Sequence, residues 1–214
     1  MLKGILFDMD GVLADSESFI CKAAIMMFSE IGLIASPEDF KPFTGMGENM
    51  YLGGVAEKHG IHVDIEVVKA RTYQIYGEIV RGNLLPLPGA LEFVRRCQDK
   101  GLRLALATSA DRIKMEINLD EIGLPLSIFD STITGLDVVR RKPAPDIYIK
   151  ASEKIGVRPE ECLVVEDAIS GIKAGKNAGC RCLAVTTSFS MESLSEADWI
   201  CNSLLDVPEE VLNW

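Results

Sequence analysis

Short apolar runs alternate along the chain with longer helical patterns, and this alternation limits the possible folds more than any other feature. The runs are Gly4–Phe7, Leu104–Ala107, Ser131–Thr134, Leu163–Val165 and Leu183–Val185. Continuous apolarity over so few residues predicts strands buried on both faces. The helical patterns each end before a glycine, and they are Ala90–Lys100, Ile113–Ile122, Pro145–Ile155 and Ile169–Ala178. We therefore predict an α/β fold with a Rossmann-like parallel sheet between layers of helices.

One interval, from Asp15 to about Leu84, interrupts the alternation. It contains no run that indicates a buried strand, whereas Phe19–Ile31 and Ile65–Val80 carry apolar residues at helical spacing. The prolines and glycine of Leu84–Gly89 disfavour helix and mark the return of the chain to the sheet. We predict that residues 15–84 form an inserted all-helical cap domain, that residues 1–14 and 85–214 form the core, and that the two connections serve as a hinge.

Charge and composition exclude several classes of partner. The chain has 32 acidic and 22 basic residues, a net charge of −10, and no long basic tract, so nucleic acid and anionic membranes are not expected partners. No apolar stretch approaches the ~18 residues of a membrane span, and Met1–Phe7 is too short for the apolar part of a signal peptide. The six cysteines include no CxxC pair, which indicates buried thiols in a reducing compartment. We expect a cytoplasmic, monomeric protein.

Two acids follow directly on the first predicted strand. Residues two apart in an extended segment share a face, so Asp8 and Asp10 can converge at the strand end, where sheets of this kind bind ligands. Two close carboxylates repel each other and call for a cation or a shared proton. A solvated turn after a strand is the ordinary alternative for this motif taken alone.

Other predicted strands also end in residues suited to phosphate or a metal. Thr108 and Ser109 follow one strand, Lys142 follows another, and Glu166-Asp167 follow a third. Hydroxyl and turn N–H groups can hold phosphate oxygens, a lysine supplies a compact positive charge, and carboxylates are ligands for Mg²⁺. Each has an ordinary explanation alone, as a helix cap or a surface charge. Their joint occurrence at strand ends favours a phosphate and Mg²⁺ site.

These residues, in this order, resemble the haloacid dehalogenase superfamily. The resemblance rests on four segments: Asp8-x-Asp10-Gly-Val-Leu, Thr108, Lys142-Pro-Ala-Pro-Asp and Glu166-Asp167. It covers essentially the whole chain. An insertion directly after the first strand is similar to the subfamily with a small helical cap, closest to the β-phosphoglucomutase-like phosphatases. The stretches around Phe43–Glu48 and Ser109–Lys114 also look like the corresponding domain of a plant thylakoid protein.

The resemblance implies a role for each motif residue. Asp8 is expected to be the nucleophile that forms an aspartyl phosphate, and Asp10 the general acid and then the general base. Thr108 and Lys142 are expected to hold the phosphoryl oxygens, assisted by Ser109. The metal ligands expected for Mg²⁺ are Asp8, the backbone carbonyl of Asp10, and Asp167, with Glu166 supporting bound water.

The cap loop Thr44-Gly45-Met46-Gly47-Glu48 is the candidate contact with the substrate's leaving group. Its two glycines permit close backbone approach, and Glu48 can meet hydroxyl groups. An ordinary connection between helices is the alternative. Gly45, Met46, Gly47 and Glu48 are accordingly predicted substrate-binding residues.

Three functions remain open from the sequence. The first is a Mg²⁺-dependent phosphatase acting on a small phosphate monoester, a sugar phosphate or similar metabolite. The second is a sugar-phosphate mutase of the β-phosphoglucomutase type, and the third is a protein that binds a phosphorylated metabolite without turnover. The mutases carry a cap histidine a few residues beyond Asp15-Ser16, where this chain has Phe19-Ile20-Cys21. This difference favours hydrolysis.

Overall fold

The computed structural model describes residues 1–43 and 47–214 and contains one parallel sheet of six strands. The strands are β1 (Gly4–Phe7), β2 (Arg103–Ala107), β3 (Ser131–Ile133), β4 (Cys162–Glu166), β5 (Arg181–Val185) and β6 (Trp199–Cys201). Their order across the sheet is β3-β2-β1-β4-β5-β6. The central strands β1 and β4 are buried along their whole length, as continuous apolarity predicts.

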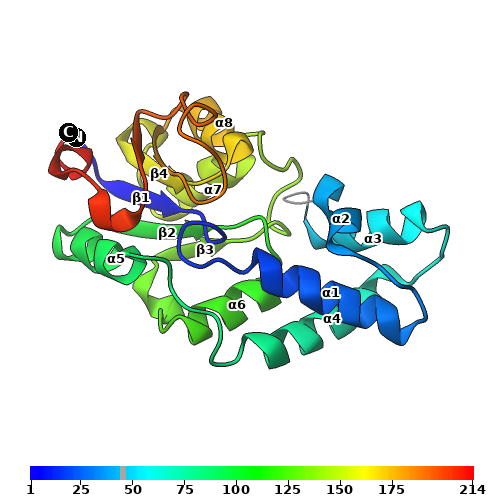
Figure 1. Ribbon diagram of the computed structural model, residues 1–214. Helices are drawn as coiled ribbons and strands as arrows, with labels where there is room; N and C mark the ends of the chain where they lie inside the picture. The colour runs from blue at the N-terminus through cyan, green and yellow to red at the C-terminus, as the bar shows by residue number, and fades with distance from the viewer. Residues whose placement is uncertain (44–46) are drawn as a thin grey trace.

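Helices cover both faces of the sheet (Figure 1). One face carries α5 (Ala90–Asp99) and α6 (Arg112–Glu121), and the other carries α7 (Asp146–Lys154) and α8 (Ile169–Ala178). Two separate clusters of buried apolar side chains lie on the two faces. The predicted α/β fold with a Rossmann-like parallel sheet is therefore confirmed.

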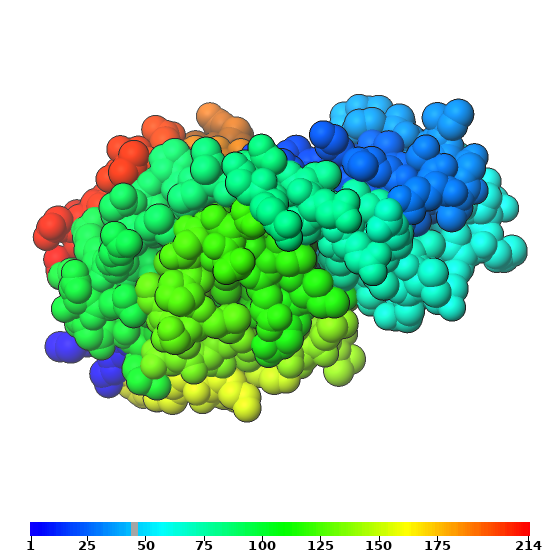
Figure 2. Space-filling model, turned by 90° about the horizontal axis from the view of Figure 1, so that it is seen from below, coloured from blue at the N-terminus to red at the C-terminus, as the bar shows by residue number. Residues whose placement is uncertain are grey.

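In the described part of the interval between β1 and α5 there are four α-helices, and they stand to one side of the sheet (Figures 1 and 2). They are α1 (Glu17–Glu30), α2 (Pro37–Phe40), α3 (Glu48–Lys58) and α4 (Ile65–Val80). The rings of Phe28, Phe40 and Tyr51 pack in series in their interior. Short 3₁₀ turns complete the described elements: η1 (Lys41–Phe43), η2 (Leu126–Ile128), η3 (Pro159–Glu161), η4 (Leu204–Asp206) and η5 (Glu209–Leu212). We call the helical part the cap.

The two connections between the cap and the sheet run beside each other. Ala14 forms isolated β-bridges with both Asp10 and Pro86, and the amide of Leu87 donates to the carbonyl of Leu13 at 2.9 Å. The chain thus leaves and re-enters the core at one place. This arrangement supports the proposed division into a core of residues 1–14 and 85–214 and a cap of residues 15–84.

Some elements differ from those that the sequence predicts. Strand β6 was not predicted, because its three residues are too few to show a pattern, and α2 and α3 were not predicted either. All six cysteines are free thiols, but Cys21 is half-buried rather than buried. No helix among the described residues is long and apolar enough to cross a membrane.

Candidate active site

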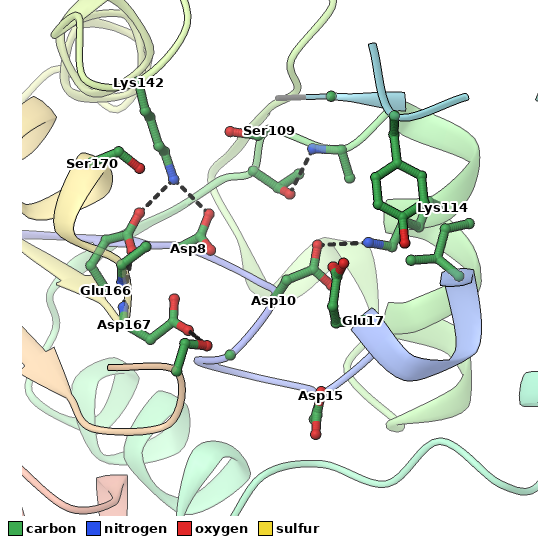
Figure 3. A pocket seen from close by; sticks show the side chains of 18 of the residues that line it. Asp8, Asp10, Asp15, Glu17, Ser109, Lys114, Lys142, Glu166, Asp167 and Ser170 are labelled. Atoms are coloured by element: carbon green, nitrogen blue, oxygen red, sulfur yellow. Dashed lines mark hydrogen bonds and ion pairs between the residues drawn. The ribbon is translucent and has the colours of Figure 1, made fainter. Parts of the chain in front are cut away.

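A cavity of about 380 Å³ opens at the carboxyl ends of the central strands. The chain builds the sheet outward from β1 through β2 to β3, then returns to place β4 on the other side of β1. Ligands bind at such a point of reversal in open α/β sheets. Asp8 follows β1 and Glu166 ends β4, so both acids lie at this point (Figure 3).

The side chain of Lys142 joins the two acids. Its Nζ donates to Asp8 Oδ1 and to Glu166 Oε1, both at 2.7 Å. Tyr148 donates its hydroxyl to the same Glu166 oxygen at 2.9 Å, and the lysine ammonium lies 5.0 Å from the centre of the Tyr148 ring. Burial alone would lower the pKa of Lys142, but the carboxylates of Asp8 and Glu166 outweigh burial and raise it. Lys142 is therefore a fixed cation at the centre of the site.

The second oxygen of Glu166 is also occupied. Glu166 Oε2 accepts the backbone amides of Asp167 and Ala168, each at 2.9 Å. Gly171 makes room for this carboxylate, since a Cβ there would lie 1.7 Å from Glu166 Oε1. With both oxygens engaged, Glu166 orients Lys142 and the start of the following turn rather than presenting a free oxygen to the cavity.

Asp8 and Asp167 are two buried acids of one cluster. One oxygen of each, together with one of Glu166, lies within 4.8 Å of the others. Burial is the main cause that raises the pKa of Asp8 to about 7, against the opposing charge of Lys142. Burial, followed by the charges of Glu166 and Asp8, raises the pKa of Asp167 to about 8. A hard cation would relieve this excess of negative charge, so the donor set fits Mg²⁺.

The loop after β1 is shaped for this cluster. Gly11 has φ +76°, and a Cβ there would lie 1.9 Å from Asp167 Oδ2. Only glycine combines that backbone conformation with so close an approach. Ser188 donates its hydroxyl to the same Asp167 oxygen and helps to hold the carboxylate.

Asp10 lies beside Asp8 but has its own partners. Its Oδ1 accepts the hydroxyl of Ser16, and its Oδ2 accepts Lys114 Nζ at 2.9 Å (Figure 3). The Lys114 side chain is only 4% exposed and comes from the first turn of α6. Burial would lower the pKa of Lys114, but the Asp10 and Glu48 carboxylates raise it. Asp10 is thus held by a buried cation that the sequence interpretation did not identify.

The strand-end hydroxyls lie where the sequence predicts them. Thr108 is buried, lines the cavity and accepts the amide of Ala110 on Oγ1 at 3.1 Å, which leaves its own proton available to donate. Ser109 also lines the cavity. A Cβ on Gly135 would lie 2.2 Å from the Ser109 carbonyl oxygen, so Gly135 permits the close packing of this segment.

The cap contributes the other end of the cavity. Gly47 precedes α3 with φ +83°, and Glu48 is the first residue of that helix; both line the cavity. The predicted contacts Gly45 and Met46 lie outside the described residues. Arg141 places its guanidinium against Gly47, since a Cβ there would lie 1.5 Å from Nη1. Arg140 instead pairs with Asp146 on the surface, at 2.7 Å.

Several lining residues escaped prediction from the sequence. They are Asp15, Glu17, Ile20, Tyr51, Lys114, Ser170, Ser188 and Phe189. A signal existed for Lys114, because it and Asn118 stand one helical turn apart on the side of α6 that buries Met115 and Leu119. A lysine on an apolar helix face indicates a buried partner. Ser188 and Phe189 lie in a segment without periodicity, which carries no comparable signal.

Comparison with known proteins places this geometry in a family. A haloacid dehalogenase-like hydrolase model matches residues 2–179. The chain is 42% identical over 199 residues to Protein SUPPRESSOR OF QUENCHING 1, chloroplastic, of Arabidopsis thaliana, covering 92% of this chain but 19% of that relative. It is 32% identical to Protein CbbY of Rhodobacter capsulatus, covering 92% of each. It is also 32% identical to Validoxylamine A 7'-phosphate phosphatase of Streptomyces hygroscopicus subsp. limoneus, covering 97% of this chain and 96% of that one.

Solved structures agree with this assignment. The crystal structure of CbbY from Rhodobacter sphaeroides in complex with phosphate has a TM-score of 0.90 at 26% identity, covering 100% of both chains. A variant of that protein in complex with xylulose-(1,5)bisphosphate has a TM-score of 0.86 at 25% identity, covering 96% of both. The predictions of a haloacid dehalogenase-type fold and of an enzyme of the phosphatase kind are confirmed. The chain therefore belongs to the haloacid dehalogenase-like hydrolases.

Proposed function

We propose that this enzyme is a Mg²⁺-dependent phosphatase that hydrolyses a small phosphate monoester, a sugar phosphate or similar metabolite, through an aspartyl phosphate on Asp8. The observation that carries the proposal is the pair of acids after β1 with separate partners. Asp8 is paired with Lys142, whereas Asp10 is held by Ser16 and Lys114. Two neighbouring carboxylates in different surroundings are suited to two different chemical roles.

Asp8 is the nucleophile in this reaction. One of its oxygens attacks phosphorus in line, the bond from phosphorus to the ester oxygen breaks, and the phosphoryl group passes to Asp8. Lys142 and the hydroxyl of Thr108 hold the phosphoryl oxygens, over which negative charge is spread in the transition state. Because Lys142 also contacts Glu166, it stays in place as the charge on Asp8 changes.

Asp10 moves the protons. It donates one to the departing alcohol oxygen, then takes one from the water that attacks phosphorus and releases inorganic phosphate from Asp8. Ser16 and Lys114 hold the two oxygens of Asp10 in place beside Asp8, and Asp10 must carry a proton on one of these oxygens when the ester bond breaks.

The residues that would hold Mg²⁺ are Asp8, Asp167 and the backbone carbonyl of Asp10, with Glu166 in support. When bound, the ion supplies positive charge to the phosphoryl oxygens and offsets the repulsion between the phosphate and the carboxylates. The donor chemistry supports this assignment, since buried carboxylates with raised pKa values surround one point. The cytoplasmic location and the monomeric state remain predictions.

The test is hydrolysis of p-nitrophenyl phosphate with Mg²⁺ by the wild type, by Asp8→Asn and by Asp120→Asn, which makes the same change at an exposed position of α6. Asp8→Asn should lose at least ~10³-fold in kcat, because it replaces the nucleophile, and the control should match the wild type. Borohydride treatment of acid-quenched enzyme should convert residue 8 to homoserine, as reduction of an acyl phosphate requires. Wild-type turnover by Asp8→Asn would refute the proposal.

A second assay separates hydrolysis from the mutase reaction. Glucose 1-phosphate with a glucose bisphosphate primer should yield inorganic phosphate rather than isomerised sugar phosphate. The described cavity lining contains no histidine, and Ile20 lines the cavity in the part of α1 where the mutases carry one. Net isomerisation without phosphate release would identify a mutase.

A further inference from the structure

The cavity has two halves of different charge balance. Its described lining includes seven carboxylates and two lysines: Asp8, Asp10, Asp15, Glu17, Glu48, Glu166, Asp167, Lys114 and Lys142. The half that contains Lys142 and Asp167 serves the transferred phosphate. The alcohol leaves toward Asp10, which protonates it, so the half beyond Asp10 receives the leaving group.

The leaving-group half is acidic. Figure 3 shows Glu17 beside Asp10 and Lys114, on the side away from Lys142. Glu48 also lines this end, and its charge acts on Lys114. Lys114 is the lysine of this half, and it is already paired with Asp10 at 2.9 Å. Residues 44–46, Thr-Gly-Met, carry no charge that could offset these acids.

Glu48 has an unsatisfied carboxylate oxygen. Its side chain is nine-tenths buried, and Oε2 accepts no hydrogen bond from the described residues. The Tyr73 hydroxyl lies near the Glu48 and Asp111 carboxylates, and burial, followed by the Glu48 charge, raises the pKa of Tyr73. An unpaired carboxylate oxygen inside a protein is costly, and a donor brought by the substrate would remove that cost.

Part of the remaining lining is apolar. Ile20 and Tyr51 come from the cap, and Phe189 comes from the segment after β5. Such walls suit the carbon skeleton of a small molecule, while the Glu48 carboxylate suits its hydroxyl or ammonium groups. A second phosphate in this half would meet carboxylates in a partly dehydrated space, where like charges repel strongly.

We propose that the leaving-group half of the cavity selects alcohols that are rich in hydrogen-bond donors and carry no anion, such as polyols and amino-polyols, and rejects those with a second phosphate or a carboxylate. This inference rests on the proposed phosphatase function. Glu48 is the residue that reads the leaving group, by accepting a hydrogen bond from a hydroxyl or an ammonium.

Arg141 is the residue that could allow the opposite preference, for a substrate with a second phosphate. Its guanidinium packs against Gly47, and its Nη1 makes no hydrogen bond to the described residues, but it does not belong to the described cavity lining. If it turned toward the cavity, it could hold a second phosphate. The substrate test below therefore includes an Arg141→Met variant.

The experiment compares kcat/KM for four sugar phosphates: glucosamine 6-phosphate, glucose 6-phosphate, gluconate 6-phosphate and glucose 1,6-bisphosphate. p-Nitrophenyl phosphate is the reference for phosphatase activity. The kcat/KM values of the cationic and neutral esters should exceed those of the two esters with an extra anion by at least about tenfold, because a second anion is repelled by the Glu48 carboxylate in a partly dehydrated space. In Glu48→Gln this ratio of kcat/KM values, called the gap below, should shrink at least about fivefold, because one of the repelling charges is gone. The control Glu57→Gln makes the same change at an exposed position of α3 and should keep the wild-type gap.

Each other result has a defined meaning. Turnover of the bisphosphate equal to or above that of glucose 6-phosphate, with the reference ester hydrolysed, overturns this inference and leaves the phosphatase proposal standing. Loss of that bisphosphate turnover in Arg141→Met would then identify Arg141 as the second phosphate contact. An unchanged gap in Glu48→Gln overturns the role of Glu48. No hydrolysis of any ester overturns both proposals.

Discussion

The buried pair of Lys114 and Asp10 allows a prediction that separates positioning of the acid from general damage to the fold. Lys114→Met keeps most of the length of the side chain and removes its charge. Two unit charges about 4 Å apart attract by about 4 kcal/mol at an effective dielectric constant near 20, and dehydration of the lysine offsets part of this. Asp10 is 28% exposed, so water screens the pair further. We expect a loss of about 1–2 kcal/mol in the free energy of unfolding.

The effect on catalysis should depend on the leaving group. Without Lys114, one oxygen of Asp10 loses its partner, and the general acid is no longer fixed toward the ester oxygen. An alkoxide must be protonated as it departs, whereas p-nitrophenolate leaves without a proton. We therefore expect kcat/KM to fall about 100-fold for a sugar phosphate, equal to about 2.7 kcal/mol of barrier, and less than about fivefold for p-nitrophenyl phosphate.

The assay measures kcat/KM for both esters beside a melting curve. Arg112→Met is the matched control, because Arg112 lies on the same helix and pairs with Glu116 on the surface at 3.1 Å. It should behave as wild type with both substrates. Equal losses of Lys114→Met on both esters would show that Lys114 supports the fold of the site rather than the acid, and no loss on either would show that Asp10 needs no cation.

Three further predictions concern the metal and the central cation. Chelation by EDTA should abolish hydrolysis of p-nitrophenyl phosphate, and Mg²⁺ should restore it. Ca²⁺ should fail to restore it, because Ca²⁺ prefers more ligands at longer distances. Full activity in the presence of EDTA would contradict the metal assignment. Lys142→Ala should reduce kcat by at least ~10³-fold, whereas the kcat of Arg140→Ala should stay within about twofold of the wild-type value. Steady-state kinetics on the folded variants measure both effects. Similar losses in the two variants would indicate a diffuse basic patch. The raised pKa values of Asp8, about 7, and Asp167, about 8, mean that the folded protein holds protons which the unfolded chain has already released above about pH 4. The stability of the metal-free protein should therefore fall as the pH rises from about 4 through 8. Mg²⁺ should raise the melting temperature more at pH 8.5 than at pH 5.5, because the ion takes the place of those protons. An equal rise in melting temperature at both pH values would refute this prediction.

The sequence predicted most of the sheet because most of its strands and the helices between them have a local signature. β1 and α4 were predicted with the same bounds that the structure has. β6 was missed because Trp199–Cys201 becomes a strand only by pairing with β5, which is a tertiary effect. The helical cap was predicted by its apolar spacing, but the short helix α2 begins with a proline and a capping serine that were not recognised.

The candidate site was predicted where its residues follow strands, and missed where they come from elsewhere. Asp8, Thr108 and Asp167 converge because parallel strands end at one edge, and Lys142 joins them from the segment between β3 and α7. Lys114 reaches the same cavity from a helix, and Ser188 from a loop, so no position in the strand pattern marks them. The place of Glu48 in the sequence did not show whether its side chain faces the cavity, since this depends on how the cap helix α3 lies relative to the sheet.

The side-by-side connections at Leu13-Ala14 and Pro86-Leu87 make the cap an exchangeable part. Because the chain leaves and returns through one pair of bridged segments, a cap of another length or sequence can be joined there without displacing β1 or α5. The proposed nucleophile Asp8, Lys142 and the proposed metal ligands all come from residues on the other side of that junction. A chimera joined at these two points should carry the substrate preference of the transplanted cap, while the chemistry stays with the sheet. Substrate range in such a protein can therefore change in evolution independently of the reaction itself.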